Sequence, residues 1–127
     1  MTYVFHIDPR NAQGPKDELG EQVRFRAQMA RNAPSVLLVA IPNAGKRSAW
    51  EARQRAREGL VKGFPDMLAM HGGRTLGLEF KSGTGQPSDA QIETLNKMHR
   101  LGFPVGIFRS AETALDWTRQ HIPEAFA

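Results

Sequence analysis

The feature that most constrains the fold is a pair of apolar runs joined by two glycines, in the segment GFPDMLAMHGGRTLGLEFKSG at residues 63–83. Gly72 and Gly73 can both adopt positive φ, which a tight two-residue hairpin turn requires. The runs on either side, Asp66 to Met70 and Thr75 to Lys81, are therefore expected to be antiparallel neighbours. The start of the first strand then lies opposite the end of the second.

This hairpin would bring three ionisable side chains to one end of the strand pair. Asp66 begins the first strand, and Glu79 and Lys81 end the second, two residues apart and hence on one face. Two carboxylates that close repel each other unless a cation lies between them. Oxygen ligands with an incomplete shell suit Mg²⁺ or Mn²⁺, and a lysine beside such a metal can orient a bound water or stabilise charge on a phosphate. The intervening Phe80 is expected to point to the opposite face, into the core.

Helical and strand patterns alternate along the rest of the chain. The patterns predict helices at Glu18–Arg31, 48–58, Asp89–Arg100 and Ala111–Gln120, and strands at Val36–Ile41 and Val105–Phe108, with a strand-like YVFHI near the N-terminus. The 127 residues suit a single domain, residues 1–127. This order predicts the α/β class, with a small mixed sheet flanked by helices.

Two patterns predict which surfaces are buried. In the helix at Glu18–Arg31, the apolar residues at spacings of three and four are expected to face the core; they are Leu19, Val23, Ala27 and Ala30, with Phe25 and Met29 widening the stripe. The continuously apolar run Val36–Ile41 is expected to be buried on both faces. Trp50 and Trp117 are expected in the core or at an interface.

The net charge of +4 comes from one segment. Residues 43–62 contain six basic and two acidic residues, whereas the remainder holds equal numbers of each. A charge run is most often a solvated helix face, but one basic element on a neutral body is also the footprint of a polyanion-binding protein. Beside a cluster of acids suited to a metal, we favour contacts with DNA phosphates; the candidate residues are Asn43, Lys46, Arg47, Arg53 and Lys62.

Other classes of site find little support in the sequence. The chain has no cysteine, which removes disulfides and thiolate zinc sites and fits a reducing cytoplasm. The stretch AGKRS lacks the spacing of a phosphate-binding P-loop, so we expect no nucleotide cofactor. The N-terminus has no signal-peptide pattern, and no apolar run is long enough to cross a membrane. We therefore expect a cytoplasmic protein.

Pro65-Asp66 followed by Glu79-Phe80-Lys81 resembles the signature of the PD-(D/E)xK nuclease superfamily. More narrowly, PNAGKRS, GFPDM, LEFKSGTGQPSDAQ and GFPVGIFRS, in this order, resemble the VRR-NUC (virus-type replication-repair nuclease) branch. The resemblance covers residues 17–120 and implies a restriction-endonuclease-like αβββαβ core.

The resemblance implies roles for individual residues. Asp66, Glu79 and the main-chain carbonyl of Phe80 would bind Mg²⁺ or Mn²⁺, and Lys81 would act on the attacking water. Glu21 matches an acid on the first helix that approaches the metal, with Glu18 as the competing choice. Gln91 matches a glutamine that contacts the site, although the aromatic residue common four positions later is Leu95 in this chain.

These roles together imply a metal-dependent deoxyribonuclease. Small members of the family resemble homodimeric resolvases of four-way (Holliday) junctions, so a homodimer, branched DNA as substrate and a phage or prophage origin are expected by resemblance. Two alternatives stay open at this stage. One is a DNA-binding accessory protein without turnover, and the other is a flap or restriction-type endonuclease.

Overall fold

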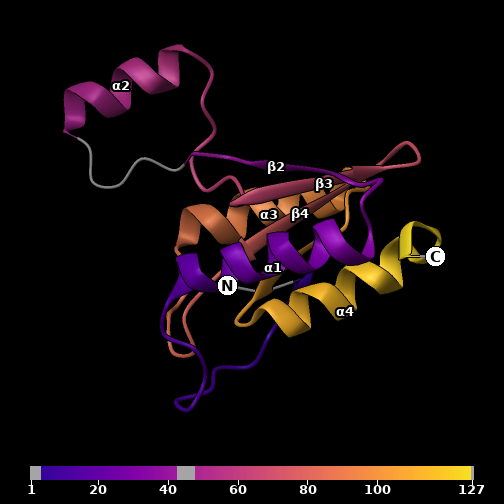
Figure 1. Cartoon of the computed structure of the whole chain (residues 1–127). Helices are drawn as coiled ribbons and strands as arrows, with labels where there is room; N and C mark the ends of the chain where they lie inside the picture. The colour runs from indigo at the N-terminus through magenta and orange to yellow at the C-terminus, as the bar shows by residue number, and fades with distance from the viewer. Residues whose placement is uncertain (1–3, 43–47, 127) are drawn as a thin grey trace.

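The computed structural model describes residues 4–42 and 48–126. One sheet and its helices account for most of this chain (Figure 1). In chain order the elements are β1 (His6–Ile7), α1 (Glu18–Asn32), β2 (Leu37–Ala40), α2 (Ala49–Arg57), β3 (Met67–His71), β4 (Arg74–Phe80), α3 (Asp89–Arg100), β5 (Val105–Phe108), α4 (Ala111–His121) and the short 3₁₀ helix η1 (Pro123–Phe126). The predicted α/β class is confirmed, and so is the order of helices and strands.

The five strands lie in the order β1-β5-β4-β3-β2. β4 pairs antiparallel with β3 and parallel with β5, and the sheet is therefore mixed. The hairpin turns at Gly72 and Gly73, whose φ angles are 57° and 77°. Met67 pairs with Leu78, which places the residue before β3 beside the last residues of β4, as the sequence predicts.

Helices cover both faces of the sheet, with α1 and α4 together on one face and α3 on the other (Figure 1). The larger core lies under α1 and α4, where Phe80 packs against Phe25 and Phe108 with ring centroids 5.7 and 6.2 Å apart. Phe108 in turn contacts Trp117 of α4. Phe80 thus points into the core as expected, and its neighbour Glu79 belongs to the α3 face.

The buried stripe of α1 differs from the predicted one. Phe25 and Met29 are buried together with Glu21, whereas Leu19 and Val23 are 65% and 50% exposed. Ala27 and Ala30, the other two residues of the predicted stripe, are exposed as well. The inward face of the helix runs through Glu21, Phe25 and Met29 at spacings of four, so the predicted stripe faces solvent. Glu21 can be buried because it accepts a hydrogen bond from the Ala111 N–H at the start of α4.

The prediction for the Val36–Ile41 run is also wrong in one respect. It forms a strand, but β2 is an edge of the sheet, and Leu37 is 61% exposed. Leu38 packs against the core under α1. Leu37 lies on the opposite face from Leu38, and an apolar run does not reveal whether a helix covers each face of its strand.

The helix α2 stands away from the rest of the molecule, beyond one end of β2 (Figure 1). None of its residues is buried, and Trp50 is 63% exposed, in contrast to Trp117 at 6%. Ser48 caps the helix by accepting a hydrogen bond from the Glu51 N–H. A helix of nine residues is marginal in water when nothing packs against it, so its Ser48 cap is an important source of local stability.

Candidate active site

At the open end of the β3–β4 hairpin, the Asp66 side chain bonds to the main chain of β4 next to Glu79. Asp66 Oδ2 accepts a hydrogen bond of 2.8 Å from the Phe80 N–H, and the Asp66 carbonyl accepts one of 2.7 Å from the Ile41 N–H. The carboxylate of Asp66 therefore lies against the β4 residue that follows Glu79. This is the convergence that the hairpin register predicts.

Glu79 is unusual for a carboxylate because only 3% of its surface is exposed. Burial and the neighbouring negative charge of Asp66 raise its pKa to about 8, while the positive charge of Lys81 opposes the rise. Its Oε1 atom is buried and accepts no hydrogen bond from a donor among the described residues, while a carboxyl–carboxylate interaction with Asp66 adds to the rise in pKa. A buried acceptor without a donor costs stability, and such atoms concentrate at functional sites.

Gln91 holds the other oxygen of Glu79. Its Nε2 donates a hydrogen bond of 2.9 Å to Glu79 Oε2, and its Oε1 accepts one of 2.9 Å from the Ser88 N–H. Because the Ser88 hydroxyl also accepts from the Gln91 N–H, the two residues form a capping box at the start of α3. The helix cap therefore fixes the amide that orients Glu79.

The segment before Asp66 touches this helix start directly. Gly63 has a φ of 80°, and a side-chain carbon there would lie 2.3 Å from the Ala90 carbonyl oxygen. The Lys62 carbonyl also accepts a hydrogen bond of 2.7 Å from the Thr94 hydroxyl. A glycine is required at residue 63 because the chain must pass against α3 to reach Asp66.

Lys81 completes the group on the α3 face. Its Nζ lies 3.8 Å from Glu79 Oε2, and its side chain is 16% exposed. Its N–H donates to the Phe108 carbonyl over 2.9 Å, which extends the β4–β5 pairing by one residue. The ammonium is thus held close to the acids but keeps a path to solvent.

The structure does not bring Glu21 into this group through any contact that it records among the described residues. Glu21 Oε1 instead accepts a hydrogen bond of 3.0 Å from the Ala111 N–H at the start of α4, and both of its oxygens accept from Arg24. The charge of Glu18, by contrast, contributes to the raised pKa of Glu79. Glu21 therefore has another partner in the structure, and the choice of Glu18 as the α1 acid at the site stays a prediction.

The oxygen-rich group fits a small hard cation with an incomplete protein shell. Within residues 4–42 and 48–126, no three histidine or acidic side chains are close enough to form a metal site by themselves. Asp66, Glu79 and the Phe80 carbonyl would therefore need water to complete the coordination, which is how Mg²⁺ is usually bound. The unpartnered Oε1 of Glu79 is the observation that favours such a ligand.

The predicted DNA-binding residues divide into two sets. Asn43, Lys46 and Arg47 lie outside the described residues. Arg53 on α2 and Lys62 after it are exposed. The Lys62 carbonyl anchors that end of the basic segment to α3, on the same sheet face as Glu79.

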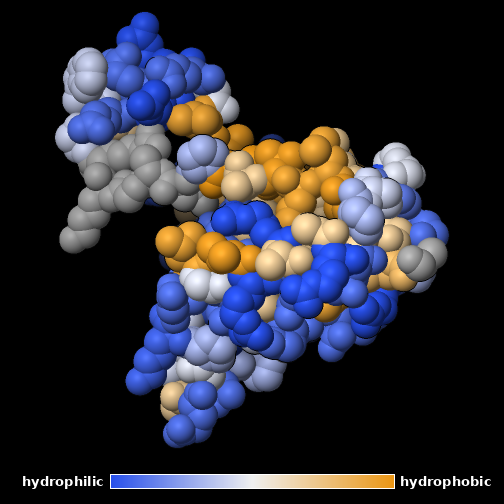
Figure 2. All heavy atoms as spheres, in the orientation of Figure 1, coloured by the Kyte–Doolittle hydropathy of each residue, from blue (hydrophilic) through white to orange (hydrophobic). Residues whose placement is uncertain are grey.

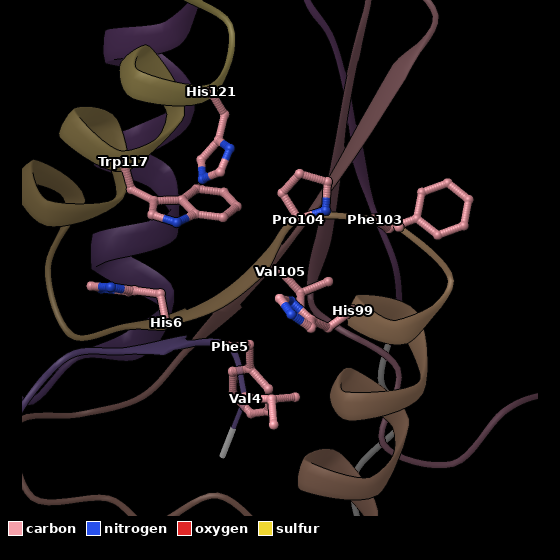
Figure 3. Close-up of a pocket in the computed structure, with 10 residues that line it drawn as sticks. Val4, Phe5, His6, His99, Phe103, Pro104, Val105, Trp117 and His121 are labelled. Atoms are coloured by element: carbon pink, nitrogen blue, oxygen red, sulfur yellow. The ribbon is translucent and has the colours of Figure 1, made fainter.

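A pocket of about 330 Å³ lies at the other end of β5 (Figure 3). Trp117 and His121 of α4, His99 of α3 and Phe103 contribute to its lining. Burial, together with the charges of Arg74 and His6, lowers the pKa of His121. The pocket lies around Val105, the first residue of β5, whereas Lys81 bonds to Phe108, the last residue of β5. The pocket and the acid cluster are therefore at opposite ends of this strand.

Comparisons with known proteins agree with this geometry at the level of the fold. No family model matches the sequence, and no curated protein matches it significantly. Among solved structures, a VRR_NUC domain protein is similar with a TM-score of 0.68 and 19% identity, over 84% of this chain and 88% of that chain. The protein therefore has a VRR-NUC-like fold. No helix in the described part of the chain is long and apolar enough to span a bilayer.

Proposed function

We propose that this protein is a divalent-metal-dependent nuclease that hydrolyses phosphodiester bonds in DNA. The observation that carries the proposal is the buried, unpartnered Glu79 oxygen beside Asp66 and Lys81, at the end of the hairpin. The VRR-NUC-like fold supports it, since the protein of similar structure carries that domain name.

The chain's own groups have distinct tasks in this mechanism. Asp66, Glu79 and the Phe80 carbonyl would hold Mg²⁺ or Mn²⁺, and Gln91 orients Glu79 through its Nε2. A bound divalent ion would polarise the phosphate and lower the pKa of a coordinated water. Lys81, whose ammonium lies near Glu79 and reaches solvent, orients the attacking water and offsets negative charge on the phosphate.

DNA would approach along the basic segment at residues 43–62. The exposed side chains of Arg53 and Lys62 contact phosphates in this arrangement, and Asn43, Lys46 and Arg47, which precede α2 in the sequence, are expected to contribute as well. Phosphate contacts position the duplex without reading its sequence, which suits a nuclease selective for DNA structure. We place it in the cytoplasm, and a phage or prophage gene is the origin that the resemblance suggests.

We further propose that two copies act together on four-way junctions, and the β2 edge supports this. Residues 36–41 contain no charged residue and no proline, the usual guards of an exposed edge, and apolar side chains reach the surface there (Figure 2). Antiparallel pairing of two β2 strands creates a two-fold axis perpendicular to the sheet. The α3 faces, and hence both acid clusters, then lie on one side of the dimer, separated by about 14 to 24 Å across the strands.

A cleavage panel tests the proposal. Labelled four-way junctions, flaps, nicked duplexes and linear duplexes would be incubated with the protein in Mg²⁺, in Mn²⁺ and in a chelator. We expect metal-dependent cleavage, with paired cuts in opposite strands of the junction. Binding to DNA without cleavage under any condition would instead identify an accessory protein, and cutting of single-ended flaps alone would leave a nuclease but exclude a resolvase.

A further inference from the structure

Arg109, the residue after β5, is buried although it is charged, with 5% of its surface exposed. Its guanidinium donates to main-chain carbonyls of two separate segments. Nε donates to Asp8 over 3.0 Å, and Nη1 donates to Ser82 over 2.6 Å and to Gly85 over 2.7 Å. Ser82 and Gly85 lie in the loop that connects Lys81 to α3, so one side chain holds that loop to the end of the sheet.

Asp8 holds Arg109 in place from the other side. Its Oδ2 accepts hydrogen bonds from the Arg109 N–H over 2.9 Å and from the Thr113 hydroxyl, and its Oδ1 lies 2.7 Å from His6 Nε2. Asp8 is itself 7% exposed. The backbone from which the guanidinium extends is thus fixed by a buried carboxylate.

The N-terminal segment closes over the same loop. The Asn11 N–H donates to the Gly83 carbonyl over 2.7 Å, and the Gly83 N–H donates to the Pro15 carbonyl over 2.8 Å. A side-chain carbon at Gly83 would lie 2.2 Å from the Asn11 carbonyl oxygen. The loop is therefore held by main-chain bonds on one side and by Arg109 on the other.

Both ends of this loop belong to the candidate active site. Lys81 immediately precedes it, and Ser88 and Gln91, which orient Glu79, follow it. A displacement of about 1 Å in a catalytic group can lower a rate by about 10²-fold. A planar guanidinium can serve several carbonyls in a fixed geometry, which an ammonium on a flexible stem does less well.

We propose that Arg109 is a positioning residue of the active site. By holding the loop at residues 82–85, it sets where the Lys81 ammonium and the Gln91 amide lie relative to Asp66 and Glu79. The inference rests on the proposed nuclease function. It assigns Arg109 no contact with DNA or metal.

The test is Arg109→Lys, which keeps the charge and loses the planar fork. The matched control is Arg74→Lys, because the Arg74 guanidinium also donates to a main-chain carbonyl, that of His121, at the other end of the molecule. We expect Arg109→Lys to lower kcat on the cleaved DNA by about 10- to 100-fold with KM nearly unchanged, while the control keeps both. A wild-type kcat in folded Arg109→Lys would overturn the inference.

Two further readouts do not depend on activity, and they decide the matter even if the wild-type protein cleaves no DNA. Amide hydrogen exchange at Gly83 and Gly85 should accelerate in Arg109→Lys while exchange in β3 and β4 stays the same. The NMR resonance of the Gln91 side-chain amide should move toward its solvent-exposed position. If both stay at wild-type values, the positioning role is excluded. Should Arg109→Lys fail to fold, Asp8→Asn should show the same changes, and wild-type behaviour there would also exclude the role.

Discussion

Gln91 Nε2 lies 2.9 Å from Glu79 Oε2, and this bond links the cap of a helix to the most buried acid of the site. The same glutamine satisfies the Ser88 N–H through its Oε1. Because the Ser88 N–H at the start of α3 occupies the Gln91 amide oxygen, the amide nitrogen is the group that faces the Glu79 carboxylate. Glu79 Oε2 is thereby occupied, and Oε1 is left for another ligand.

Replacing either acid of the hairpin should abolish cleavage. Asp66→Asn and Glu79→Gln are each expected to reduce metal-dependent cleavage by more than about 100-fold, because each removes a charged oxygen ligand and leaves an amide. Circular dichroism should show an unchanged fold. Glu93→Gln, an exposed change on α3, is the control. Near wild-type turnover in either acid variant would place the site elsewhere.

Gln91→Ala should weaken the site less than loss of an acid. We expect about a 10- to 100-fold loss of cleavage or of metal affinity, the range typical of residues that orient a metal ligand. Ser88→Ala is the informative control, since it removes the helix cap, at a cost of about 1 kcal/mol in stability, but retains the glutamine. Equal losses of activity in the two variants would mean that Gln91 acts only through the cap.

The raised pKa of Glu79 predicts a pH dependence of stability in the absence of metal. Between pH 4.5 and about 8 the folded protein keeps the Glu79 proton, whereas the unfolded chain loses it. The Glu79 proton therefore contributes its full stabilisation below pH 4.5, the pKa in the unfolded chain. As the pH rises from there through the folded pKa of about 8, this part of the free energy of unfolding is lost, at up to about 1.4 kcal/mol per pH unit. Urea unfolding across this range should reveal the slope. Glu79→Gln should flatten it, and an unaltered slope in that variant would assign it to another group.

The basic segment should bind DNA phosphates. Arg53→Gln combined with Lys62→Gln is expected to weaken DNA binding and to make the log–log dependence of affinity on salt shallower by about 0.9 for each phosphate that is no longer neutralised. Arg31→Gln combined with Arg100→Gln changes the net charge equally at exposed positions on α1 and α3 and should leave the slope as it is. Fluorescence anisotropy over a salt series measures both. A shallower slope in the control alone would move the DNA to another face.

The β2 edge should control assembly. Light scattering of the wild-type protein should give twice the 14.1 kDa chain mass, and Leu37→Lys should give a monomer because a charge enters the pairing edge. Val23→Lys, at another exposed apolar position, should remain a dimer. A wild-type monomer, or a dimer that survives Leu37→Lys, would exclude this interface.

The sequence by itself determined the hairpin and its consequences. Two glycines that can take positive φ join two strand-forming runs into a hairpin. Because side chains alternate along a strand, local geometry alone brings together Asp66, Glu79 and Lys81. The Ser88 cap and the boundaries of α3 follow from equally local signals. Each of these depends on residues close together in the chain.

Only the tertiary structure decided which surfaces have partners. Glu21 accepts from the Ala111 N–H, 90 residues away, and Arg109 holds carbonyls at Asp8 and Ser82. β2 is an edge although its sequence is that of a covered strand. Periodicity reports how apolar a face is, but burial depends on whether a distant segment arrives to cover it, and that is settled by the packing of the whole chain.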